Sequence, residues 1–229
     1  MARRRKEKDQ DETLVDIEEV RGSMLDYFEN NKMLVLGGIA ALILLVGGYM
    51  FYKFGVIQPR AEEAQTSLFR AETQFARDSF ALALESPGGD AEGLLDIIEN
   101  YGGTKQANLA KYYAGVSYLN LGRYDEAIEY LSSFDPSGSE ILNAMKNGAM
   151  GDAYSELGDM GKAASAYSSA SKGGDEFSAP YYLNKLGLLK KREGDTEAAL
   201  SAFKQIDSKY PNSTEARSAT RYITLLENM

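Results

Sequence analysis

One long apolar run dominates the pattern of hydrophobic and polar positions in this sequence. Residues 33–52, MLVLGGIAALILLVGGYMFY, contain no charged side chain and lie between Lys32 and Lys53. A helix of about 20 residues rises about 30 Å, which matches the hydrocarbon thickness of a bilayer. Such a helix also satisfies its own backbone hydrogen bonds inside lipid. The pattern therefore predicts a transmembrane helix over residues 33–53.

The charges beside this segment predict its orientation. Basic residues gather before the segment, and only Lys53, Arg60 and Arg70 follow it closely. Basic flanks stay in the cytoplasm, so residues 1–32 form a cytoplasmic tail and residues 54–229 are translocated. A cleavable signal peptide is the main alternative, but small residues should then follow the apolar run. Bulky aromatic residues end it instead, which favours an uncleaved anchor.

A weaker helical pattern precedes the anchor. Leu14, Ile17, Met24 and Phe28 recur at roughly helical spacing after a charged first dozen residues. This pattern predicts a short juxtamembrane helix. Two interpretations remain open, because the helix could simply lead into the bilayer or could offer its apolar stripe to a membrane partner.

The body contains a repeat of 36 residues. The segment LGRYDEA at 121–127 returns as LGDMGKA at 157–163 and as EGDTEAA at 193–199. Each copy predicts two helices, with a glycine in the left-handed conformation between them. The repeated positions are the turn glycines Gly122, Gly158 and Gly194; the first-helix glycines Gly115, Gly151 and Gly187; the tight contacts Ala127, Ala163 and Ala199; and the large side chains Leu131, Tyr167 and Phe203.

These positions resemble the tetratricopeptide repeat, whose two-helix unit carries small, aromatic, Gly, Ala and large apolar residues in that order. A degenerate unit precedes the three copies, because residues 89–95 align with 194–200, and its first helix runs from about Pro59 to Glu85. Residues 214–229 form a helix that covers the last repeat. The predicted fold is all-α: a single N-terminal transmembrane helix and then an α-solenoid of about three full repeats, a degenerate N-terminal repeat and a C-terminal capping helix.

Composition argues against several kinds of chemistry. The chain has no Cys and no His, which removes thiol nucleophiles, disulfides and the commonest general acid–base residue. Its formal net charge of −9 does not favour nucleic acid as a partner. We therefore expect neither an enzyme nor a cofactor, metal or small-molecule substrate. A membrane-bound hydrolase is the remaining enzymatic hypothesis.

Stacked helix pairs instead offer an extended face for binding proteins. The resemblance to the tetratricopeptide repeat implies which first-helix positions line a groove. They are Leu109, Tyr112, Val116 and Asn120 in the first copy; Met145, Gly148, Asp152 and Glu156 in the second; and Tyr181, Asn184, Leu188 and Arg192 in the third. This mixture of apolar, aromatic and polar groups suits a peptide or a partner's helix.

A second resemblance involves the segment that enters the membrane. With Tyr27-Phe28-Glu29-Asn30-Asn31-Lys32, one anchor and a helical-repeat body, the chain resembles the YfgM-like proteins of bacterial inner membranes. The resemblance implies an accessory subunit of the SecYEG translocon that meets a PpiD-like periplasmic chaperone and exported chains. It also implies membrane-proximal docking by Tyr27, Phe28, Glu29, Asn30 and Lys32. A scaffold for another envelope complex, in cell division or outer-membrane assembly, is the alternative.

Overall fold

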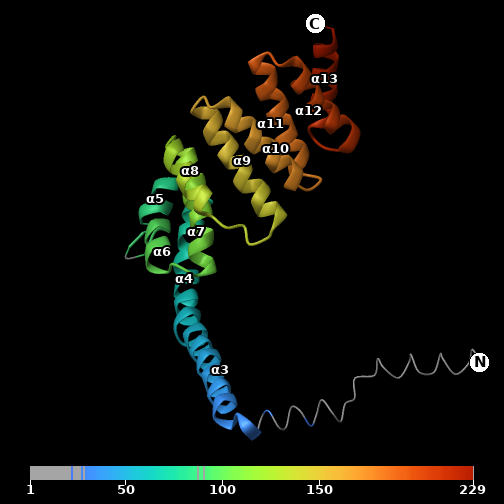
Figure 1. Cartoon of the computed structure of the whole chain (residues 1–229). Coiled ribbons are helices and arrows are strands. Elements are labelled where there is room, and N and C mark those ends of the chain that lie inside the picture. The colour runs from blue at the N-terminus through green and yellow to red at the C-terminus, as the bar shows by residue number, and fades with distance from the viewer. Residues whose placement is uncertain (1–21, 23–26, 28, 87, 90, 229) are drawn as a thin grey trace, which may run out of the picture. The chain divides into compact units, whose positions relative to one another are not determined.

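The computed structural model describes residues 22, 27, 29–86, 88–89 and 91–228, and within them every regular element is a helix (Figure 1). The all-α prediction is confirmed for this part of the chain. Two compact units are present, Met1–Val56 and Ile57–Met229, and each is described by itself. Of the residues that predict a juxtamembrane helix, Leu14, Ile17, Met24 and Phe28 lie outside the described residues.

The first unit contains α3 (Lys32–Tyr52), none of whose residues is buried. Leucine, isoleucine and valine side chains are exposed on all sides of this helix. Its most apolar 18-residue window has a mean hydropathy of 2.3, so by length and composition the helix can cross a membrane. A short π-helix, η1 (Lys53–Ile57), follows α3.

The second unit is built from ten α-helices in the described residues. They are α4 (Gln58–Phe75), α5 (Phe80–Glu85), α6 (Leu94–Asn100), α7 (Lys105–Asn120), α8 (Tyr124–Ser133), α9 (Glu140–Glu156), α10 (Met160–Gly173), α11 (Ser178–Glu193), α12 (Thr196–Lys209) and α13 (Ala216–Glu227). From α7 onward, each long helix is followed by a second helix that packs against it, and α13 packs on α12. We call this unit the helical body.

The prediction of one helix from Pro59 to Glu85 was wrong. The chain leaves the helix after Phe75 and turns through residues 76–79, where Asp78 has a positive φ of 55°. The turn brings Phe80 back onto Phe75, with 5.5 Å between the ring centroids, and Phe75 also meets Tyr113 at 5.0 Å. Burial of these aromatic rings stabilises the break, although no glycine or proline marks it in the sequence.

The glycines explain the 36-residue period. Gly122, Gly158 and Gly194 have φ angles of 75°, 80° and 79°, as predicted for left-handed turns. The first-helix glycines allow close approach: a Cβ would lie 2.6 Å from Leu131 on Gly115, 2.6 Å from Tyr167 on Gly151 and 2.7 Å from Phe203 on Gly187. Ala127, Ala163 and Ala199 are fully buried. Each glycine of a first helix therefore accommodates the large side chain of the helix that follows.

Candidate functional site

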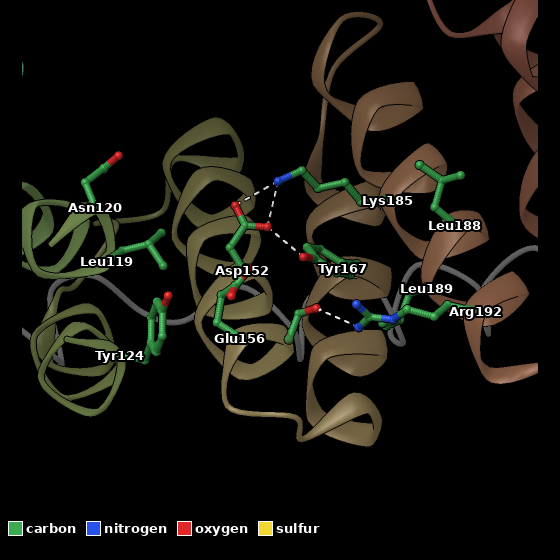
Figure 2. Close-up of a pocket in the computed structure, with 11 residues that line it drawn as sticks. Leu119, Asn120, Tyr124, Asp152, Glu156, Tyr167, Lys185, Leu188, Leu189 and Arg192 are labelled. Carbon is green, nitrogen blue, oxygen red and sulfur yellow. Dashed lines mark hydrogen bonds and ion pairs between the residues drawn. The ribbon is translucent and has the colours of Figure 1, made fainter. Parts of the chain in front are cut away.

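The first helices of the repeated pairs line an open groove of about 680 Å³ (Figure 2). Side chains from α7, α9 and α11 contribute most of its wall, and α8 and α10 add one tyrosine each. We call it the charged groove. Its lining consists of Leu119, Asn120, Tyr124, Asp152, Ser155, Glu156, Tyr167, Lys185, Leu188, Leu189 and Arg192.

Asp152 is the centre of the polar contacts in this groove. Figure 2 shows its carboxylate between Lys185 and Tyr167. The ammonium of Lys185 donates to both carboxylate oxygens, at 2.6 and 2.8 Å, and the Tyr167 hydroxyl donates at 2.6 Å. The side chains of Asp152 and Lys185 keep 31% and 26% of their exposure, so the pair lies partly out of water. Charge-assisted hydrogen bonds of this length hold all three side chains in place.

Close backbone packing sets this geometry. Gly151 precedes Asp152 on α9 and lets the Tyr167 ring lie against the helix, which brings the hydroxyl to the carboxylate. Gly148, one turn earlier on α9, is covered by the ring of Tyr182 from α11. The aspartate and the lysine therefore meet because small residues let α10 and α11 approach α9 closely.

Lys185 is surrounded by groups that favour its charged form. Its ammonium lies 5.0 Å from the centre of the Tyr181 ring and 5.8 Å from that of Tyr167, within the range of cation–π attraction. Burial by itself lowers the pKa of Lys185, but the hydrogen bonds and the charge of Asp152 outweigh it and raise the pKa above its ordinary value. The lysine therefore keeps its positive charge at neutral pH.

The rim of the groove carries two further charges. Arg192 donates to the Ser155 hydroxyl at 3.1 Å and contacts the Met160 sulfur at 2.9 Å. Among the described residues, Glu156 forms no ion pair, and neither does Arg192. One exposed acid and one exposed base are thus available to a bound molecule, beside the apolar side chains of Leu119 and Leu188.

The predicted groove residues separate into two sets. Asn120, Asp152, Glu156, Leu188 and Arg192 line the charged groove. The other predicted residues do not line it. On α7, Leu109 and Val116 are half-buried, and Tyr112 packs on Phe134 and Tyr113. Met145 and Tyr181 are exposed nearer the starts of α9 and α11, Gly148 lies under Tyr182, and half-buried Asn184 has a side-chain oxygen without a hydrogen bond among the described residues.

Sequence reasoning missed Lys185 and the hydroxyl of Tyr167. Tyr167 was predicted only as a packing residue of a second helix, and its ring is indeed buried. A usable signal existed for the lysine, because Asp152 and Lys185 carry opposite charges at nearly one repeat's spacing. The other lining residues that were not predicted are Leu119, Tyr124, Ser155 and Leu189.

The predicted membrane-proximal residues belong to the other unit. Tyr27, Glu29 and Asn30 are helical and exposed, and exposed Lys32 begins α3. Phe28 lies outside the described residues. Asn31 donates its backbone N–H and its side-chain amide to the Tyr27 carbonyl, each at 3.0 Å. The structure thus places exposed Tyr27, Glu29 and Asn30 just before the apolar helix and exposed Lys32 at its first position.

Two tyrosines next to the groove predict a stability change at alkaline pH. Burial and the neighbouring Tyr113 raise the pKa of Tyr112 to about 12, and burial with Tyr112 and Tyr181 raises that of Tyr182 to about 12. A tyrosine whose pKa is raised on folding stabilises the fold below pH 10, and this stabilisation is lost as the pH rises through 12. From pH 9 to 11 we expect urea titrations to show a loss of about 1–2 kcal/mol, after a discount for partial exposure. The double variant Tyr112→Phe, Tyr182→Phe should lose clearly less stability over this pH range. An equal loss would contradict the assignment of the alkaline effect to these two tyrosines.

A family model matches residues 63–223, which is more than half of the chain and covers most of the helical body. Its description is the N-terminal domain of EccA1, an ESX-1 secretion system (T7SS) protein. The chain belongs to the family of the EccA1 N-terminal domain. The match to this family includes every residue of the charged groove and leaves out α3. No curated protein matches the chain significantly.

Proposed function

We propose that this chain is a membrane-anchored protein-interaction module whose charged groove binds a segment of a partner protein. The observation that carries the proposal is the Asp152–Lys185 pair at an open groove between α9 and α11. Apolar contact is offered by Leu119 and Leu188, and opposite charges by Glu156 and Arg192. Such a lining suits an amphipathic helix or peptide that carries both an acid and a base.

The helix pairs α7–α8, α9–α10 and α11–α12 are interpreted here as three tetratricopeptide-like repeats, with α13 as their cap. The shared glycine contacts support this interpretation. Helices α4 to α6 then stand for the degenerate first repeat. Repeats of this kind bury their cores between neighbours and leave the first helices available to partners.

We propose that α3 anchors the protein in a bacterial inner membrane, with the N-terminus in the cytoplasm and the helical body in the periplasm. The apolar surface of α3 and the basic residues before it support this topology. Because the native chain has no Cys, single-cysteine variants report position without background. A cysteine at exposed Ser132 should react with a membrane-impermeant maleimide only from the periplasmic side, and cytoplasmic labelling would refute the topology.

Two lines of support suggest protein export as the setting. The resemblance to the YfgM-like proteins favours an accessory subunit of the Sec translocon that passes exported chains to a PpiD-like chaperone. The family of the helical body is named after a protein of another secretion system, which keeps a scaffold for a different envelope complex as the second candidate. Under either candidate the chain binds proteins and performs no chemistry on them.

Site-specific crosslinking in cells tests this proposal. A photoreactive amino acid replaces Leu188 in the groove of the full-length chain, and exposed Leu225 on α13 serves as the matched control position. Crosslinks from position 188 to SecYEG or the PpiD-like chaperone, but not from 225, would support the first candidate. Crosslinks to a different secretion or envelope complex would support the second candidate. If no protein is crosslinked specifically from position 188, the charged groove is not the binding site for a partner protein.

A further inference from the structure

A second exposed surface lies at the N-terminal ends of α9 and α11. Four large apolar side chains are exposed there: Ile141 by 51%, Met145 by 36%, Phe177 by 85% and Tyr181 by 45%. They come from equivalent positions, because Phe177 and Tyr181 follow Ile141 and Met145 by one 36-residue repeat. We call these four residues the apolar edge.

Contacts between α9 and α11 place these residues at the same end of the helical body. Tyr182 covers Gly148, Lys185 binds Asp152 and Arg192 binds Ser155, so the two helices run parallel. The residues before Gly148 and before Tyr182 must then lie together. In Figure 1 the loops before α9, between α10 and α11 and between α12 and α13 lie along one side of the helical body.

A pocket of about 390 Å³ continues from the apolar edge. Phe177 forms one wall, and Tyr210 and Pro211 from the loop between α12 and α13 form another. Ser213 also lines this pocket, and its buried hydroxyl has no hydrogen-bond partner among the described residues. The pocket therefore offers aromatic walls that suit a large apolar side chain.

The charges beside Ile141 and Phe177 are mainly acidic, whereas Lys185, paired with Asp152, lies on the ring of Tyr181. Glu140 and Glu176 directly precede Ile141 and Phe177, and Glu215 lines the pocket opposite the single base Lys209. Among the described residues, Glu140 and Glu176 form no ion pairs. Asp175 differs, because its carboxylate accepts from Ser178 at the start of α11. Two acids beside exposed apolar side chains complement a segment that carries Lys or Arg next to large apolar residues.

We propose that the apolar edge binds an unfolded polypeptide segment in which large apolar side chains alternate with Lys or Arg. An apolar side chain enters the pocket beside Phe177, and basic side chains face Glu140 and Glu176. The edge crosses two helices rather than following one, which suits an extended chain. Tyr181 adjoins the charged groove through its contact with Lys185, but none of the four residues of the apolar edge lines that groove, so the proposal does not depend on the groove's partner.

Peptide binding to the full-length chain in zwitterionic phosphatidylcholine nanodiscs tests the proposal. The probe is a fluorescein-labelled 15-residue peptide of alternating Leu and Lys, and empty nanodiscs give the lipid background. Fluorescence anisotropy should show saturable binding that Phe177→Ser weakens about tenfold or more, since a buried aromatic contact is lost. The double variant Glu140→Gln, Glu176→Gln should weaken it several-fold and flatten its salt dependence.

The control variant Leu225→Ser removes a large apolar side chain on α13 that is 47% exposed, close to the 51% of Ile141, and should leave the affinity unchanged. Circular dichroism verifies that each variant keeps its helices, and Ile141→Ser provides a second variant of the edge. Equal binding by wild type and Phe177→Ser would overturn the site. Equal binding of a peptide of alternating Leu and Glu would overturn the basic specificity. Loss of binding in Leu225→Ser would show that the effect is not local to the edge.

Discussion

Replacement of Phe203 by Ala is expected to lower the free energy of unfolding of the helical body by about 3–5 kcal/mol. The side chain is fully buried, lies against Gly187 of α11 and stacks on Tyr222 of α13 with 4.9 Å between ring centroids. Its removal leaves a cavity where three helices meet. Gly187 faces the Phe203 ring and has no side chain of its own to fill that cavity, so most of the cost remains.

Urea unfolding of the full-length chain in detergent micelles, followed by circular dichroism, measures this change. The control is Phe69→Ala on α4, which removes the same side chain from a position that is 67% exposed. We expect it to change the stability by less than about 0.5 kcal/mol. A loss below about 1 kcal/mol in Phe203→Ala would contradict the packing described for α11 to α13.

The second large effect is expected from Asp152→Ala, which removes the acceptor shared by Lys185 and Tyr167. It leaves a half-buried ammonium and a hydroxyl without their partner. We expect a loss of about 2 kcal/mol, less than for a fully buried pair because water reaches both side chains. Crosslinking from position 188 should fall as well, since the wall of the charged groove loses its order.

A double-mutant cycle with Lys185→Met separates the pair from general damage. If the ion pair exists, the double variant should be more stable than the sum of the single losses predicts, whereas additive losses would refute it.

Alkaline pH provides a second measurement of the ion pair. Because the pKa of Lys185 is raised above about 10.5, its stabilisation is present below that pH and is lost as the pH rises through the folded-state pKa. Asp152→Ala should show less of this alkaline loss than wild type.

Much of the fold follows from local sequence patterns. The apolar run before Lys53 predicts α3 within one residue at each end, because charged residues flank it on both sides. The glycines of the repeat predict the turns after α7, α9 and α11, since only glycine adopts their positive φ without strain. The break after Phe75 has no such mark, because it is stabilised by aromatic contacts with Phe80, directly after the turn, and with Tyr113 of the distant helix α7.

The candidate site was predictable only as a set of helix faces. The resemblance to the tetratricopeptide repeat implies groove positions on α9, of which the structure places Asp152 and Glu156 in the charged groove. The same resemblance implies a groove position for Tyr112 on α7, yet its ring packs on Phe134. Periodicity describes one helix at a time, whereas the residues that meet across a groove depend on how neighbouring helices are shifted and rotated.

The sequence by itself determined the apolar helix, the helix pairs and the repeated glycine, alanine and large side-chain positions. These features depend on hydropathy, on backbone conformation and on the 36-residue spacing, all of which can be read along the chain. Only the tertiary structure decided that Lys185 and the Tyr167 hydroxyl meet at Asp152. The physical reason is that the close contacts at Gly148 and Gly151 set the register between α9 and its neighbours, and register determines which polar groups come within bonding distance.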